Sequence, residues 1–112
     1  MDSTYDIQNA RAQMRKGMIE FCTILVISRG PIYASDILDA LKKANLLVVE
    51  GTLYPLLSRL KSAGLLAYSW EESKAGPPRK YYTLTAEGKL ALKNLKHSWQ
   101  EFSQSIETLI AE

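Results

Sequence analysis

The apolar residues of this chain change their spacing at both ends of the stretch 66–84. Outside it they recur every three or four residues, which is the period of a helix. Within it, residues 66–71 alternate large apolar side chains with small or polar ones, which is the period of a strand. Residues 79–84, rich in tyrosine and threonine, predict a second strand, and the polar, Gly- and Pro-rich residues 72–78 predict a loop between the two. The spacing therefore predicts helices, followed by one β-hairpin and a final helix.

Three helices are predicted before the hairpin, over residues 7–28, 34–44 and 50–63. The third follows Val49, a poor N-cap, and ends before Gly64, which tolerates the left-handed conformation. One side of this third helix is expected to be buried, because it carries four leucines, Leu53, Leu56, Leu57 and Leu60.

The last helix is predicted to begin after Thr85, a good N-cap, and to carry one apolar stripe. The stripe keeps a strict spacing of three and four residues through Leu92, Leu95, Trp99, Phe102, Ile106 and Leu109. It spans about two and a half heptads, fewer than the three or more of a self-standing coiled coil, so it must be buried against another element. The first helix carries a matching stripe. We therefore expect these two helices to pack across a twofold axis and form a homodimer.

Two short helices followed by a hairpin are typical of a winged helix-turn-helix. The predicted fold class is mainly α with a small β-hairpin (α+β), in one domain of 112 residues. We expect an N-terminal helix in residues 5–28, the winged helix-turn-helix in residues 31–85 and a dimerisation helix in residues 86–112.

Composition excludes several classes of protein. The net charge of +2 is too small to indicate nucleic-acid binding by itself, so the positions of the charges must decide. With one cysteine, Cys22, and one histidine, His97, we expect no disulfide, metal site or cofactor. No glycine-rich phosphate loop or nucleophile motif occurs, so an enzyme is the weakest interpretation. The apolar runs are too short to span a membrane, and the N-terminus lacks the apolar core of a secretory signal, so we expect a soluble cytoplasmic protein.

The third helix and the hairpin offer a candidate DNA-binding surface. Opposite its leucines, the third helix presents a small, mixed polar surface with cations at its edges. Its residues are Thr52, Tyr54, Pro55, Ser58, Arg59 and Lys61. Short side chains allow a helix to approach base edges in the major groove, and Arg59 suits a guanine or a phosphate. Arg79 and Lys80 follow the predicted loop, where a wing would meet the DNA backbone, and Lys74 adds a third cation. Each residue alone is more simply explained as solvated surface.

Two motifs resemble the PadR family of transcriptional regulators. Residues 51–60 read Gly-Thr-Leu-Tyr-Pro-Leu-Leu-Ser-Arg-Leu, similar to the family's recognition helix, and residues 78–88 read Pro-Arg-Lys-Tyr-Tyr-Thr-Leu-Thr-Ala-Glu-Gly, similar to its wing and exit into the last helix. With a single helix after the wing, the chain resembles the short branch of the family. The resemblance implies a homodimeric, ligand-responsive repressor that binds double-stranded DNA at a palindromic operator.

The resemblance also implies an effector site. Multidrug-sensing members of the short branch stack planar aromatic compounds against a tryptophan in the region of Trp99, where Met14 and Met18 would serve as adaptable walls. The alternative for Trp99 is a plain packing residue, and for the two methionines it is core filling. For the whole chain, the alternative is a winged-helix module that binds protein and no DNA.

Overall fold

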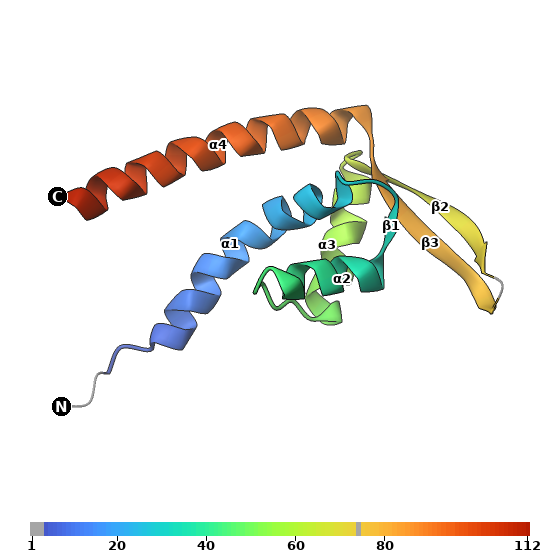
Figure 1. The fold of residues 1–112 in the computed structure, drawn as a ribbon, viewed down its shortest axis with the longest axis horizontal. Coiled ribbons are helices and arrows are strands. Elements are labelled where there is room, and N and C mark those ends of the chain that lie inside the picture. Colours follow the sequence, from blue (N-terminus) through green and yellow to red (C-terminus); the bar gives the residue numbers. More distant parts are fainter. Residues whose placement is uncertain (1–3, 74) are drawn as a thin grey trace.

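The computed structural model describes residues 4–73 and 75–112, which form four helices and a small three-stranded antiparallel sheet (Figure 1). The elements follow in the order α1 (Ile7–Ile27), β1 (Ile32–Tyr33), α2 (Ala34–Lys43), α3 (Glu50–Ser62), β2 (Leu66–Ser73), β3 (Gly76–Leu84) and α4 (Ala86–Ala111). The predicted fold class, α+β with a hairpin between the third and the last helix, is confirmed.

The helix ends follow the local chemistry of the sequence. Thr85 caps α4 as predicted, because its side chain accepts a hydrogen bond of 3.0 Å from the backbone N–H of Gly88. At Val49, no side chain of the described residues caps α3. Gly64 follows α3 with a φ of +82°, and the backbone N–H of Leu65 donates back to the carbonyl of Leu60. The C-terminal end of α3 therefore follows a local signal in the sequence, whereas its first residue has no capping signal.

The sheet contains one strand that the sequence did not reveal. The strand order is β1-β3-β2, and β1 pairs antiparallel with β3 through Ile32↔Tyr82 and Tyr33↔Tyr81. A strand of two residues carries no readable alternation, and its partner lies about fifty positions away in sequence. The consequence for function is that Tyr33, at the start of α2, is placed beside the hairpin.

The hairpin is longer than predicted. β2 continues to Ser73 and β3 begins at Gly76, so among the described residues the prediction of a loop over residues 72–78 was correct only at Ala75. The two prolines at 77 and 78 are tolerated because the register shifts there: Glu71 pairs with Arg79 but Ser73 pairs with Gly76. This irregularity leaves Glu72 opposite two residues that cannot donate to the ladder. Lys74, the third predicted wing cation, lies outside the described residues.

The core lies between α1, α2, α3 and the sheet. Its buried side chains include Ile24 and Ile27 of α1, Ile37 and Leu41 of α2, and the four predicted leucines of α3. Because the four leucines hold α3 by one side, its opposite side is left at the surface beside the hairpin. The predicted inner stripe of the third helix is thus confirmed.

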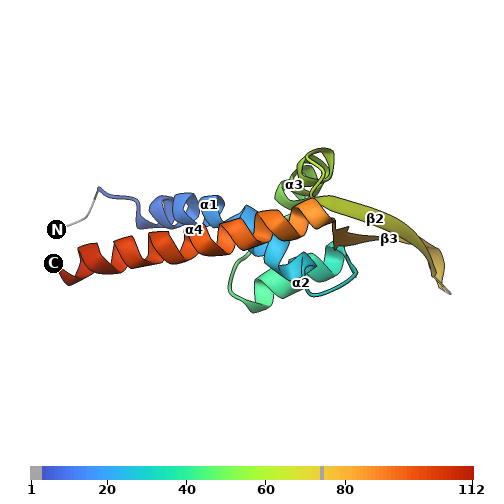
Figure 2. The same ribbon diagram turned by 90° about the horizontal axis from the view of Figure 1, so that it is seen from above.

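α1 and α4 extend away from this core on the side opposite the hairpin (Figures 1 and 2). They contact each other, and the molecule is elongated, with extents of 57 × 34 × 23 Å. On α4, Leu92 is buried and Leu95 is half-buried, whereas Phe102 is 62% exposed and Ile106 and Leu109 are exposed as well. Within the described part of the chain, no helix combines the length and apolarity needed to cross a membrane.

Candidate nucleic-acid interface

The exposed side of α3 is divided between two hollows. Tyr54 and Ser58 face the hairpin and line a cleft of about 540 Å³. Thr52, Pro55 and Arg59 line a separate hollow between α3 and α1. The structure therefore does not gather all the predicted residues of α3 into one surface.

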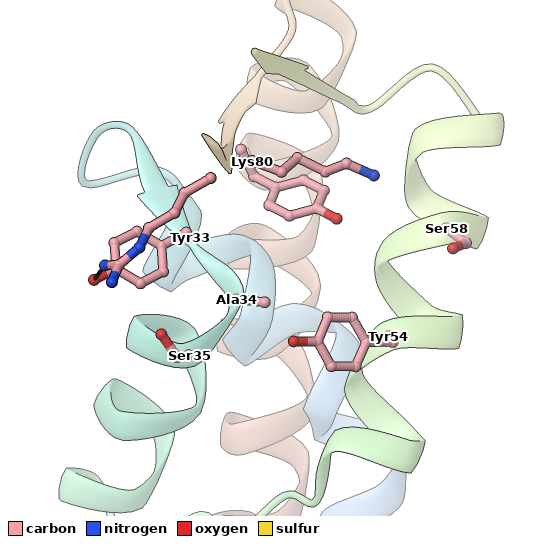
Figure 3. Close-up of a pocket in the computed structure, with 8 residues that line it drawn as sticks. Tyr33, Ala34, Ser35, Tyr54, Ser58 and Lys80 are labelled. Atoms are coloured by element: carbon pink, nitrogen blue, oxygen red, sulfur yellow. Dashed lines mark hydrogen bonds between the residues drawn. The ribbon is translucent and has the colours of Figure 1, made fainter. Parts of the chain in front are cut away.

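The cleft lies where α3, the start of α2 and the hairpin meet. Its lining residues are Tyr33, Ala34, Ser35, Tyr54, Ser58, Arg79, Lys80 and Tyr82. Figure 3 shows the hydroxyl of Tyr54 pointing into the cleft and the side chain of Lys80 reaching across it toward α3. Among the described residues, the lining contains two cations, several hydroxyls and no carboxylate. Such a surface suits a polyanion.

Arg79 is held in place by Tyr33. Its guanidinium lies 4.8 Å from the centre of the Tyr33 ring and donates a hydrogen bond to the phenol oxygen. Tyr33 is itself packed edge-on against Tyr81, with the ring centres 5.1 Å apart. The hydrogen bond uses one N–H of a guanidinium that has five, so donors remain for a ligand. Nothing in the sequence indicated Tyr33, because the contact depends on the unpredicted β1.

The start of α2 adds positive potential to the same cleft. Tyr33 stands at the N-cap position, and no side chain in the described ranges caps this helix. The first N–H groups of a helix have no partner within the helix and carry the positive end of its dipole. Ala34 and Ser35, in the first turn, both line the cleft beside Arg79 and Lys80, whereas the carboxylate of Asp36 in the same turn does not line it. Phosphate oxygens match this set of donors.

Two lysines of the predicted surface, Lys61 and Lys80, lie against aromatic rings of the hairpin. The ammonium nitrogen of Lys80 is 4.2 Å from the ring centre of Tyr68 and 5.4 Å from that of Trp70. That of Lys61, at the end of α3, is 4.8 Å from the same Tyr68 ring. The structure thus brings Lys61 to the hairpin rather than to the middle of the α3 surface.

Arg59 is engaged elsewhere. Its Nη1 donates to Oε1 of Glu20 on α1 at 2.7 Å, and both side chains remain largely solvated. Exposed ion pairs of this kind are weak, so a phosphate or a base edge can compete for the guanidinium. The structure therefore shows Arg59 drawn toward α1, on the side of α3 away from the cleft.

Two titratable groups that are partly or fully removed from water stay uncharged near neutral pH. Burial, and then the neighbouring Tyr54 and Tyr68, raise the pKa of Tyr82 at the floor of the cleft, so its phenol adds no negative charge. Burial also raises the pKa of the half-buried Cys22 thiol on α1. In residues 4–73 and 75–112, no cluster of three or more His, Cys, Asp or Glu side chains could hold a metal ion.

The predicted effector residues are only partly brought together. Trp99 is 43% exposed, and its ring centre lies 6.3 Å from that of Phe21 on α1. On α4 it borders an open hollow with Gln100, Ser103, Gln104 and Glu107. Met14 is exposed and Met18 half-exposed, and neither lines a described pocket. Phe21, which the sequence interpretation did not single out, is the aromatic partner of Trp99 in this structure.

Comparison with known proteins points to one family. The family described as "Transcriptional regulator PadR-like family" matches residues 24–94, well over half of the chain. None of the curated proteins is a significant match.

Solved structures agree with the family match. A PadR-like transcription factor from Bacteroides fragilis shares 53% identity, with 90% of this chain and 98% of that chain covered and a TM-score of 0.75. A PadR family transcriptional regulator from Eggerthella lenta shares 29% identity over 93% of this chain and 91% of its own, with a TM-score of 0.85. A PadR-like transcriptional regulator from Bacillus cereus shares 34% identity over 88% and 96%, with a TM-score of 0.77.

Proposed function

Since the chain belongs to the PadR-like family of transcriptional regulators, which are non-enzymatic DNA-binding proteins, we propose that it is a repressor. In this proposal it acts in the cytoplasm, binds a palindromic operator as a homodimer, and loses affinity for DNA when a planar aromatic effector binds between the subunits. The expected alternative, a winged-helix module that binds only protein, predicts no affinity for duplex DNA.

The observation that carries the DNA-binding surface is the cationic cleft. Arg79, Lys80 and the uncapped start of α2 face one space that no carboxylate of the described chain lines. A DNA strand lying there would place phosphates against these donors, while α3 enters the major groove with Tyr54 and Ser58 nearest the cleft. Thr52, Pro55 and Arg59 would follow on the other side of the helix. Phosphate contacts supply most of the affinity, and base contacts from α3 supply the sequence preference.

The proposed dimer rests on the exposed apolar stripe of α4. Phe102, Ile106 and Leu109 are left uncovered by the described part of their own chain, whereas Leu92 and Leu95 already pack against it. The first half of α1 exposes Ile7 and Met14 in the same way. Pairing α1 and α4 with those of a second copy would bury both stripes and place Trp99 at the edge of the interface.

The partial exposure of Trp99 supports the proposed effector site. A planar aromatic compound could stack on its indole, and Glu107 in the same hollow favours a cationic guest. A guest between the subunits would change their angle and therefore the separation of the two α3 helices. It can shift the protein only as far as its affinities for the two arrangements differ.

The direct test is a footprint of the purified protein on the DNA upstream of its own gene. We expect two protected half-sites, about 10 bp apart or a multiple of that, related by a twofold axis. Protection should fade when Arg59 and Arg79 are both replaced by alanine. Absence of any protection at low salt, or an unchanged footprint with the double variant, would contradict the proposed surface.

A further inference from the structure

One face of the hairpin carries three aromatic rings packed together. Tyr68 pairs with Tyr82 across β2 and β3, and Trp70 pairs with Lys80, so these four side chains share a face. The ring centre of Tyr68 is 6.2 Å from that of Tyr82 and 6.3 Å from that of Trp70. Tyr68 therefore occupies the middle of the cluster, where it is supported on both sides and still 36% exposed.

Two ammonium groups from different elements converge on this one ring. Lys61 comes from the end of α3 and Lys80 from β3, and their nitrogens lie 4.8 Å and 4.2 Å from the centre of the Tyr68 ring. The negative face of an aromatic ring attracts a cation at such distances. An unrestrained lysine side chain would instead sample many rotamers.

Within the described ranges, neither lysine has a carboxylate to neutralise it. The ion pairs among these residues are those of Arg59 with Glu20 and of His97 with Glu101. Glu71 pairs with Arg79 in the register, and so lies on the opposite face of the hairpin. Glu72, two positions after Trp70 on β2, forms none of the ion pairs found among the described residues. A ring attracts an ammonium group without consuming its three N–H donors, so both lysines keep their capacity for an anion.

We propose that Tyr68 is a positioning residue for DNA binding. Its ring holds the ammonium groups of Lys61 and Lys80 together at the junction of α3 and the hairpin, ready to take phosphates of a single DNA strand. The ring thereby fixes where the backbone lies relative to α3. This inference rests on the proposed function, and it adds a residue that touches no base and carries no charge.

The physical advantage is preorganisation. The ring attracts each ammonium group before DNA arrives, so both lysines are already placed at the junction of α3 and the hairpin. When phosphates replace the solvent, the lysines have little rotamer freedom left to lose, so more of the electrostatic attraction is expressed as affinity.

The experiment measures the binding of a fluorescein-labelled 24-bp duplex of mixed sequence at low salt, by anisotropy. Mixed-sequence DNA is sufficient because phosphate contacts do not depend on sequence. Tyr68→Leu removes the ring, and Tyr68→Phe keeps the ring but removes the hydroxyl. Each is made in the wild type and in a Lys61→Met, Lys80→Met background, and thermal melting verifies that every variant is folded.

We expect Tyr68→Leu to weaken binding by about two- to fivefold for each lysine that the ring holds. Tyr68→Phe should bind within about twofold of the wild type, because phenylalanine attracts cations as tyrosine does. In the background without the two lysines, Tyr68→Leu should have no further effect.

Equal weakening by Tyr68→Leu in both backgrounds, unchanged binding by that variant, or a loss with Tyr68→Phe as large as with leucine would overturn this inference alone. A wild-type protein that does not bind the duplex at all would overturn the proposed function together with it.

Discussion

At the scale of single residues, four cations of the candidate surface are held by side chains from other elements of the fold. Tyr33 holds Arg79, Tyr68 holds two lysines, and Glu20 holds Arg59. The first two partners are aromatic and leave the positive charge available. The third is a carboxylate and neutralises it. For Arg59, therefore, DNA must compete with the protein itself.

Replacing Glu20 with glutamine should strengthen DNA binding. The substitution removes the carboxylate that pairs with Arg59, and an exposed pair of this kind corresponds to at most about fivefold in affinity. Glu112→Gln makes the same change of charge at the far end of the chain and is the matched control. Binding by fluorescence anisotropy should tighten for Glu20→Gln more than for the control. Equal tightening would mean that only net charge matters.

Gly88 should be the glycine least tolerant of substitution. It is buried in the first turn of α4, and a β-carbon there would overlap the carbonyl oxygen of Leu65. We expect Gly88→Ala to lower the free energy of unfolding by about 1–3 kcal/mol through overpacking. Gly51→Ala is the control, because its β-carbon would meet nothing within 4 Å, and stability should be unchanged or slightly raised. Urea denaturation at one protein concentration compares the two, and equal losses would contradict the steric account.

At the scale of elements, the sequence predicted what depends on local periodicity and capping. The helices begin and end within about two residues of expectation, because Gly64, Thr85 and the leucines of α3 act through neighbours along the chain. β1 and the full length of the hairpin were missed, because they depend on pairing between strands. Pro77 and Pro78 argue locally for a loop, and only the shifted register opposite Glu72 accommodates them.

The residues of the candidate site were likewise only partly predictable from the sequence. Four residues predicted from the sequence line one cleft in the structure: Arg79, Lys80, Tyr54 and Ser58. The contact of Arg59 with α1 could not be predicted, because its partner, Glu20, is 39 positions away in sequence. Tyr33 was missed because it pairs with a strand 48 positions away, and Tyr68 was missed because a positioning residue has no signature of its own in the sequence.

The apolar stripe of α4 has a buried part and an exposed part, and a charged substitution should have a different effect in each. Phe102→Lys places a charge on the exposed part, so the chain should stay folded but sediment as a monomer. Leu92→Lys places a charge in the chain's own core, so it should lose its fold instead. Sedimentation velocity and circular dichroism at micromolar concentration distinguish the two outcomes. A wild type that sediments as a monomer would contradict the proposed dimer.

The effector proposal predicts a specific fluorescence response from Trp99. In the absence of DNA, a planar aromatic cation such as 9-aminoacridine should quench the protein's emission by stacking on that indole. Trp99→Ala removes the response, and Trp70 remains in the variant as the internal control. Equal quenching in the wild type and the variant would show that Trp99 is only a packing residue.

At the scale of the whole molecule, the fold places several positive charges of this weakly charged chain at one end. The net charge of +2 cannot account for binding to DNA, but the sheet and α3 bring Arg79, Lys80 and Lys61 to one end of an elongated chain. The exposed stripes of α1 and α4 lie away from the hairpin, so a second copy can join there and leave both cationic ends available (Figure 1). Dimerisation would then double the number of cations that meet one duplex.

Binding of the DNA backbone by this end of the molecule is tested by the salt dependence of affinity for the upstream DNA. The logarithm of the affinity should fall linearly with the logarithm of the salt concentration, and Arg79→Ala with Lys80→Ala should reduce the slope by about 0.9 for each phosphate that the protein no longer neutralises. Lys93→Ala with Lys96→Ala, which removes the same charge from α4, should leave the slope nearly unchanged. Equal slopes for the wild type and the hairpin variant would show that Arg79 and Lys80 do not contact phosphates.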